Sequence, residues 1–279
     1  MSKVNLKEKA KNAEKKPAAI GPDIDLAAYS LQAEDHEEIK RLTGLSGEVK
    51  ERAVTVGIDA EEACRSGSFF QMDHSVILSS AYQSGLEVMS TTEAVKKYGW
   101  LRDYWWKAVQ VDADKYTAQA ELKQNHGYFL RALPGSRAEF PLQACLYMTR
   151  EGLAQNVHNV IIAEEGSELH IITGCTTAQH VRSGLHVGVS EFYIKKNAKV
   201  TFTMIHNWAE GVAVRPRTGA IVEENGVFMS NYICMRPVKT LQMYPTAYCT
   251  GENATVRYNT ILYAPEGSSM DVGSRVFLS

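Results

Sequence analysis

The amino-acid sequence predicts a mostly β protein whose C-terminal half is a parallel β-helix with two strands in each coil. Turn positions fall at 197, 211, 225, 239, 253 and 267, a constant step of 14, and each is Gly or Asn except Lys239. Apolar and polar residues alternate after these turns, as in a strand with one buried face. A strand and a tight turn fit into 14 residues whereas a helix does not, so one coil takes about 28 residues.

The alternation also predicts which side chains point into the β-helix. Positions 3 and 5 after each turn are mostly apolar: Leu169 and Ile171, Val200 and Phe202, Phe228 and Ser230, Val256 and Tyr258. Position 9 gives a column of Cys175, His206, Cys234 and Leu262. Because positions one coil apart lie one strand spacing apart, about 4.8 Å, three potential metal ligands are expected to stack on adjacent coils.

The composition limits the class of protein. A chain of 279 residues with 44% apolar residues can bury a substantial core. A formal net charge of -2 gives no reason to expect nucleic acid or an anionic membrane as a partner, since either favours a basic surface. No run approaches the roughly 18 apolar residues of a membrane span, and the Lys-rich segment 1–16 lacks the apolar stretch of a signal peptide. Five cysteines without a CxxC pair favour free thiols in a reducing compartment. We therefore expect a cytoplasmic protein.

The first half of the chain is predicted to contain a tail and a helical region. Residues 1–22 combine Lys with Ala, Glu and Pro and are expected to be a disordered Lys-rich tail. Residues 23–125 are predicted to be mainly helical, beginning with a charged helix from Ile24 to about Val54. From His126 the period changes to two, so residues 126–279 are predicted to form the parallel β-helix core. The apolar positions of the first helix are Leu26, Leu31, Ile39 and Leu42.

A capping-box pattern at 90–93 predicts the start of an amphipathic helix. Apolar residues then follow at alternating steps of four and three as far as Ala108. The aromatic residues of this segment could form a platform for nucleobases, but the acidic charge balance and the helical spacing favour packing in a core or an interface. They are Trp100, Tyr104, Trp105 and Trp106.

A series of short motifs then follows from Tyr98 to the end of the chain. They are YGWLRDYWWK at 98–107, FPLQA at 140–144, IAEEG at 162–166, GCT at 174–176, LH at 185–186, HNW at 206–208, YP at 244–245 and DVG at 271–273. In this order they resemble the SufB/SufD family of iron-sulfur cluster assembly proteins, most closely SufB and the short members from minimal systems. The family fold is a right-handed parallel β-helix with flanking helical regions, which agrees with the periodicity.

The resemblance implies a scaffold subunit, not an enzyme, on which iron and persulfide sulfur are assembled into a transiently bound cluster, expected to be 4Fe-4S. It implies a SufC-type ATPase, a second SufB/SufD-type subunit in a homodimer or heterodimer, a sulfur donor and apo-protein acceptors as partners. The chain has no Walker A loop, which fits a subunit acted on by an ATPase. Other readings are an architectural subunit of the same complex without cluster ligands, and a carbohydrate-binding β-helix, which predicts secretion and paired acidic or basic residues that the sequence does not show.

Cys175, Cys234 and His206 are the candidate metal ligands, because thiolates select iron-sulfur clusters and imidazole can complete the shell. Cys175 lies in the GCT motif of the resemblance, although free cysteines are often only core residues. Cys234 is supported by the column alone, so packing and ligation are equally open for it. His206 stands where SufB commonly has Gln, and a hydrogen-bonded structural role is the simpler alternative. The remaining cysteines rank lower: Cys64, Cys145 and Cys249.

The sequence ends in a strand-like segment at 275–279. The last coil is therefore expected to present an open edge with unpaired backbone groups. The resemblance implies a further C-terminal helical region that docks SufC, and this sequence does not contain it. On that interpretation the sequence is truncated, and we expect it to self-associate and to bind SufC weakly.

Overall fold

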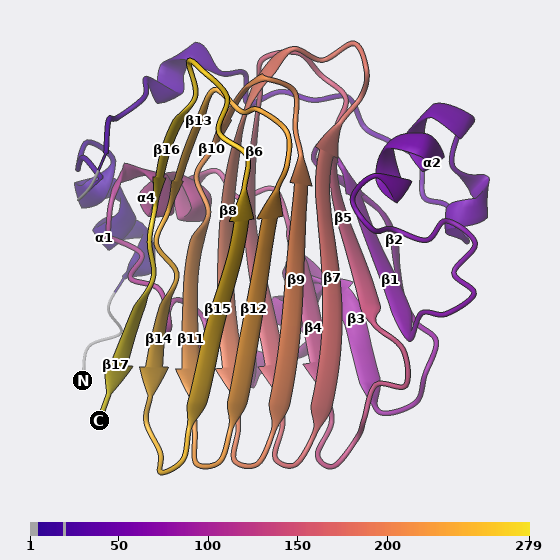
Figure 1. Ribbon diagram of the computed structural model, residues 1–279, viewed down its shortest axis with the longest axis vertical. Helices are drawn as coiled ribbons and strands as arrows, with labels where there is room; N and C mark the ends of the chain where they lie inside the picture. The colour runs from indigo at the N-terminus through magenta and orange to yellow at the C-terminus, as the bar shows by residue number, and fades with distance from the viewer. Residues whose placement is uncertain (1–4, 19–20) are drawn as a thin grey trace.

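The computed structural model describes residues 5–18 and 21–279 and shows two β-sheets that face one another in a flattened solenoid (Figure 1). The first sheet has the order β15-β12-β9-β7-β5-β1-β2. Its strands are β1 (Gly67–Met72), β2 (Ser75–Ala81), β5 (Leu142–Met148), β7 (Glu168–Thr177), β9 (Lys199–Asn207), β12 (Val227–Cys234) and β15 (Thr255–Leu262). The predicted β-helix with two strands per coil is confirmed.

The second sheet contains ten strands. They are β3 (Leu86–Ser90), β4 (Tyr128–Ala132), β6 (Leu153–Ala163), β8 (Ser183–Ile194), β10 (Gly211–Val214), β11 (Arg217–Val222), β13 (Thr240–Met243), β14 (Thr246–Cys249), β16 (Ser269–Val272) and β17 (Arg275–Leu278). The long strand β8 pairs with both β10 and β11, which follow one another along the same row. Pro216 and Pro245 separate the two halves of the next rows, because proline has no N–H for a ladder hydrogen bond.

The coil repeat is 28 residues in the regular part of the solenoid. Val227 pairs with Lys199 on one side and with Thr255 on the other, and all three strands run parallel. The preceding coil is longer, since Glu168 pairs with Lys199. Antiparallel pairs occur at the N-terminal end, between β1 and β2 and between β3 and β4.

Asparagines form a ladder along the turns at one edge. Asn197, Asn225 and Asn253 have φ angles of 59°, 53° and 58°, a left-handed conformation that Asn tolerates better than most residues. The Nδ2 of Asn225 donates to Oδ1 of Asn197, and Asn253 donates in the same way to Asn225, each at 3.1 Å. At the other edge, glycine is required at position 211 for lack of space, because a Cβ there would lie 2.4 Å from the carbonyl oxygen of Arg182. The 14-residue step therefore marks both edges of the solenoid.

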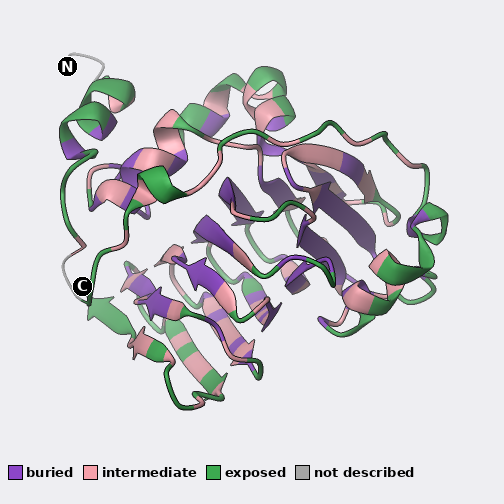
Figure 2. Cartoon of the chain, turned by 90° about the horizontal axis from the view of Figure 1, so that it is seen from above, coloured by how far each residue is buried: buried purple, intermediate pink, exposed green. Residues whose placement is uncertain are grey.

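The main apolar core lies between the two sheets. Leu169, Ile171, Val200, Phe202 and Phe228 are all buried in it, as the alternation predicted. Burial decreases toward the C-terminal strands (Figure 2): β6 is buried throughout, whereas every residue of β17 is exposed.

The N-terminal region is not mainly helical, which corrects the prediction for residues 23–125. It contributes β1, β2 and β3 to the two sheets, so the sheets begin before residue 126. In place of one helix from Ile24 to Val54 there are two short 3₁₀ turns, η1 (Leu26–Ala28) and η2 (Leu42–Gly44), and the helix α2 (Gly47–Val54). Extended backbone between them bonds to strands, since Ser30 donates to the carbonyl of Gly152 and Ile39 to that of Ile77. Sheet edges thus satisfy backbone groups that a helix satisfies internally.

The predicted disordered tail is also corrected where the structure describes it. Residues 6–13 form the helix α1 (Leu6–Ala13), and its buried Ala10 and Ala13 join an apolar cluster with α4 (Lys115–Leu122). This tertiary contact stabilises a helix that composition alone does not. Residues 1–4 and 19–20 of the predicted tail lie outside the described residues.

The capping box is confirmed, but the helix after it is short. Ser90 and Glu93 cap one another at the start of α3 (Thr91–Lys97), and the 3₁₀ turn η3 (Gly99–Asp103) follows. Trp106 has a φ of 56°, which ends any helical continuation. The tryptophans pack against protein groups, as predicted. Within the described residues no helix combines the length and apolar character needed to cross a membrane.

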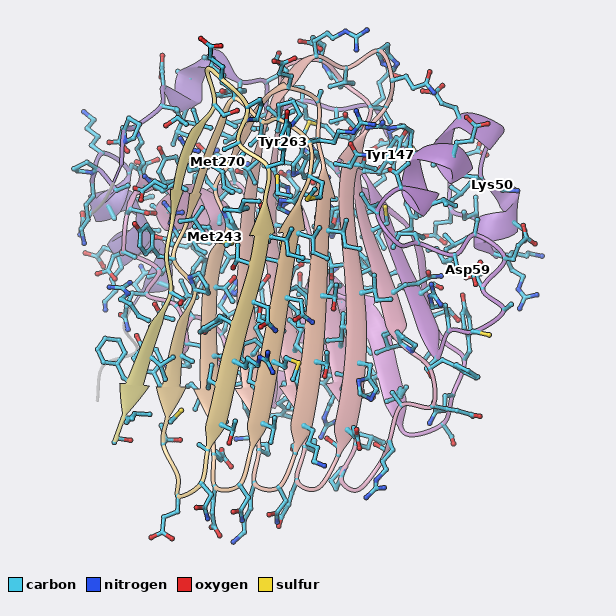
Figure 3. All side chains as sticks on the ribbon, viewed as in Figure 1. Lys50, Asp59, Tyr147, Met243, Tyr263 and Met270 are labelled. Atoms are coloured by element: carbon cyan, nitrogen blue, oxygen red, sulfur yellow. The ribbon has the colours of Figure 1, made fainter. Side chains whose placement is uncertain are left out.

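The segment that contains Trp105, Trp106 and Val109, called the aromatic loop below, is joined to the second sheet by a fully buried carboxylate. Glu191 of β8 accepts the backbone N–H groups of Trp106 and Ala108 at 2.7 Å and of Val109 at 3.0 Å. It also contacts Nε2 of His158 at 2.8 Å, and the His158 ring lies 4.1 and 4.3 Å from rings of Trp105 and Trp106. On the first sheet, Tyr147 of β5 lies beside α2 (Figure 3) and belongs to a separate apolar cluster that includes Ala53 of α2.

Replacing Asn225 separates two contributions to stability, the tolerance of a positive φ angle and the side-chain hydrogen bonds of the ladder. Asn225→Ala should lower the free energy of unfolding by about 1–2 kcal/mol, because alanine is strained at positive φ. Asn225→Gly should cost less, since glycine keeps the conformation and loses only exposed hydrogen bonds worth under about 1 kcal/mol. Urea unfolding measures both, and equal losses would show that the side-chain ladder, not the backbone, decides stability.

Replacing Glu191 should release the aromatic loop. Glu191→Gln should lower the free energy of unfolding by about 3 kcal/mol, because the buried N–H groups lose a charged acceptor and gain a competing donor. Glu223→Gln removes a surface ion pair with Lys195 and should cost under about 1 kcal/mol. Thermal or urea unfolding compares the two variants; a similar small loss in both would contradict the anchoring role of Glu191.

Candidate functional site

The three predicted metal ligands lie in one row of the first sheet. Cys175 of β7 pairs with His206 of β9, and His206 pairs with Cys234 of β12, with Leu262 next in the row. All three side chains are buried, and both cysteines belong to the core between the sheets. The predicted alignment of these residues on adjacent coils is therefore confirmed. Two strand spacings place the Cα atoms of the two cysteines about 10 Å apart.

The glycine of the GCT motif has a packing reason. A Cβ at Gly174 would lie 2.5 Å from Cγ2 of Val56 and 2.8 Å from its carbonyl oxygen. The backbone after α2 therefore presses directly on the outer face of β7, while Cys175 points to the inner face. Cys145 pairs with Gly174 and packs in the same outer cluster as Val56, so it is on the opposite face from the column.

Aromatic rings and a second histidine surround His206. Its Nδ1 hydrogen-bonds the hydroxyl of Tyr232 at 2.8 Å, and its Nε2 has no hydrogen-bond partner among the described residues. His186, from β8 of the opposite sheet, lies with its ring centroid 6.1 Å from that of His206. Trp208 packs 4.9 Å from His186 and 5.7 Å from His206.

Sequence reasoning missed His186 and Tyr232 as members of this cluster. A signal existed for Tyr232, which precedes Cys234 by two positions and therefore points to the same side of β12. The approach of His186 depends on how the two sheets face each other, which the spacing along one sheet does not contain.

Burial sets the protonation of the cluster. It raises the pKa of the Cys175 and Cys234 thiols above their ordinary value. Burial, with a smaller effect of His186, holds the pKa of His206 well below its usual range, and burial lowers the pKa of His186 to about 3. At neutral pH the thiols are therefore protonated and both imidazoles are neutral.

Across residues 5–18 and 21–279, no group of three or more His, Cys, Asp or Glu side chains is arranged closely enough to hold a metal ion. Ligation by the column therefore stays a prediction. The other cysteines lie apart from it: Cys64 is exposed, Cys145 is on the outer face, and Cys249 ends β14 in the second sheet.

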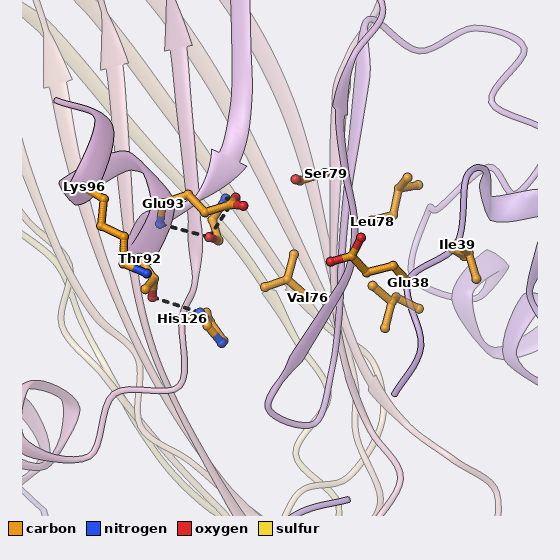
Figure 4. Close-up of a pocket in the computed structure, with 11 residues that line it drawn as sticks. Glu38, Ile39, Val76, Leu78, Ser79, Thr92, Glu93, Lys96 and His126 are labelled. Carbon is orange, nitrogen blue, oxygen red and sulfur yellow. Dashed lines mark hydrogen bonds between the residues drawn. The ribbon is translucent and has the colours of Figure 1, made fainter. Parts of the chain in front are cut away.

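A pocket of about 390 Å³ lies elsewhere, at the N-terminal end of the solenoid (Figure 4). Glu38 and Val76 line one side of it, and Glu93, Lys96 and His126 line the other. Nδ1 of His126 and the hydroxyl of Thr92 form a hydrogen bond of 2.9 Å. None of the three predicted ligands contributes to this pocket, so it is not assigned to the site.

Comparison with known proteins identifies the family. Residues 146–279, which carry the whole column, match the family model described as SUF system FeS cluster assembly, SufBD core domain. An iron-sulfur cluster assembly SufBD family protein of Methanothermobacter thermautotrophicus is 52% identical over 276 residues, covering 97% of this chain and 67% of the relative. The chain belongs to the SufBD family.

Other SufBD relatives are more distant. A SufBD family protein of Archaeoglobus fulgidus is 48% identical over 240 residues, covering 85% of this chain and 64% of the relative. The iron-sulfur cluster assembly protein SufB of Bacillus subtilis is 27% identical over 236 residues, covering 82% of this chain and 50% of that protein. The chain thus spans between half and two thirds of the length of these relatives.

The buried imidazole of His186 should make stability depend on pH. Its pKa is about 3 in the folded protein and about 6.5 when unfolded, so the unfolded state binds more protons between these values. The contribution of His186 to the free energy of unfolding is therefore fully present above pH 6.5 and is lost as the pH falls below it. From pH 7 to pH 5 this histidine should account for a loss of about 2 kcal/mol.

Urea unfolding at both pH values checks this with His186→Gln, which should lose about 2 kcal/mol less than the parent over the same interval. His180→Gln, which removes an exposed histidine, should behave like the parent. An unchanged pH dependence in His186→Gln would contradict the assignment.

Proposed function

We propose that this SufBD protein is a scaffold subunit of iron-sulfur cluster assembly, which accepts sulfur and iron, holds a 4Fe-4S cluster transiently and passes it to apo-proteins. The observation that supports it most directly is the register of Cys175, His206 and Cys234 inside the solenoid of a chain that belongs to this family. The subunit is not itself the enzyme in this proposal.

The donor atoms suit the proposed cargo. Thiolates are the soft ligands that iron-sulfur clusters require, and a neutral imidazole nitrogen can serve as a further ligand. The Nε2 of His206 has no hydrogen-bond partner in the part of the chain that the structure describes, while its Nδ1 is held by Tyr232, which fixes the orientation of the ring.

The buried setting of the thiols fits transient binding. Each thiol must lose a proton when it binds iron, and burial raises the pKa of both thiols. Protons therefore compete with the metal more strongly here than at an exposed site. A cluster bound in this way is released more easily than one held by thiols of low pKa.

The proposal includes partners. A SufC-type ATPase supplies ATP hydrolysis, a second SufB/SufD-type subunit completes a homodimer or heterodimer, a sulfur donor delivers persulfide sulfur, and apo-proteins receive the cluster. We place the protein in the cytoplasm, where its five free cysteines remain reduced.

A second candidate function is an architectural subunit of the same complex without cluster ligands. Cys175 is fully buried in the main apolar cluster with Leu146 and Met204, which is the ordinary environment of a packing cysteine. This observation favours the second candidate as directly as the column favours the first.

Anaerobic reconstitution with iron and sulfide distinguishes the two. The parent protein should become brown, and Cys175→Ser and Cys234→Ser should each lower bound iron and acid-labile sulfide by half or more, because each removes a soft ligand. Cys145→Ser is the matched control, since Cys145 is equally buried but faces away from the column. Full cluster content in both column variants, with lowered thermal stability, would instead establish the architectural role.

A further inference from the structure

A surface pocket of about 300 Å³ lies where the strands of the column end. Thr177, Trp208 and Arg236 line it, and each follows a column residue by two positions. Arg52 of α2 and Arg182 of the loop before β8 complete its basic lining. The pocket therefore lies between α2 and the ends of β7, β9 and β12.

Three arginines thus line one pocket together with a single acidic residue among the described ones, Glu210. Within the described part of the chain, no ion pair joins Arg52, Arg182 or Arg236 to a carboxylate. Nearby Glu151 accepts the backbone N–H of Arg182 at 2.6 Å, and its pKa is lowered mainly by this bond and in smaller part by the charge of Arg182. Like charges held together in this way favour an anion between them.

Part of the pocket is fixed before any ligand binds. Arg52 donates to the carbonyl oxygens of Thr177 at 2.8 Å and of Asn207 at 3.1 Å, so its position is set by two strand ends. Trp208 is 3% exposed, and its buried Nε1 has no hydrogen-bond partner among the described residues. A buried donor without a partner is costly unless a ligand or water satisfies it.

We propose that this pocket binds a small divalent oxyanion of the phosphate or thiosulfate class. The planar fork of an arginine matches the spacing of oxyanion oxygens and forms charge-assisted hydrogen bonds with them. Arg236 offers such a fork, whereas Arg52 and Arg182 already donate some of their N–H groups to the protein and add the remaining ones. The size of the pocket admits a small molecule, not a folded domain. The inference goes beyond the cluster proposal and does not rest on it, because it depends on the arginines and not on the thiols.

Isothermal titration calorimetry of the protein with sodium phosphate, sodium thiosulfate and sodium chloride, at matched ionic strength, tests the proposal. Saturable binding of at least one divalent oxyanion, with none for chloride, is expected. Binding of phosphate alone assigns the pocket to phosphate groups, and binding of thiosulfate alone assigns it to a sulfur-bearing anion. Heats that do not saturate, or that are equal for all three salts, overturn the proposal.

Variants show whether binding occurs at this pocket. The double substitution Arg182→Gln and Arg236→Gln removes two exposed charges and should weaken binding by about tenfold or more. Arg137→Gln is the control, since Arg137 is also exposed and lies outside the pocket. Circular dichroism checks that all variants fold. Equal affinity in the double variant and the parent, or an equal loss in Arg137→Gln, would show that the site is elsewhere.

Discussion

The parallel pairing of strands in successive coils is the constraint on which the rest of this structure depends. Each strand bonds its backbone to the coil before and the coil after, so a residue lies beside the residue 28 positions away. The same register that stacks Phe228 on Val200 stacks Asn225 on Asn197 and Cys234 on His206. Core, edge and candidate site are therefore three consequences of one ladder of hydrogen bonds.

In addition to the strands β1–β3 and the apolar clusters, a few polar groups attach the N-terminal region to this ladder. Glu191 collects three backbone N–H groups of the aromatic loop, and Arg52 joins α2 to the ends of β7 and β9. Such bonds need exact positions, and a stack of rigid strands provides them. Because Arg52 is held in this way, it also becomes a fixed wall of the arginine-lined pocket.

The inner face of the solenoid gives the candidate site its chemistry and limits it. Burial keeps Cys175 and Cys234 protonated and His186 and His206 neutral, so the cluster carries no charge at neutral pH. Metal binding there must displace protons and reorganise packed side chains. The arginine-lined pocket differs from the column because it is open to the surface, whereas the column is buried. Only two residues along each strand separate the two sites.

The sequence by itself determined the coil repeat, the inward positions, the capping box at Ser90 and the column of Cys175, His206 and Cys234, because each depends on spacing along one strand or one turn. It did not determine the extended path of residues 24–46, the helix α1, or the entry of β1–β3 into the sheets. Those segments are stabilised by partners far away in the chain, such as Gly152 for Ser30 and α4 for Ala10. His186 joins His206, and three arginines meet at one rim, only because two sheets and α2 pack together. Local periodicity records which face a residue occupies, whereas tertiary packing decides what that face meets.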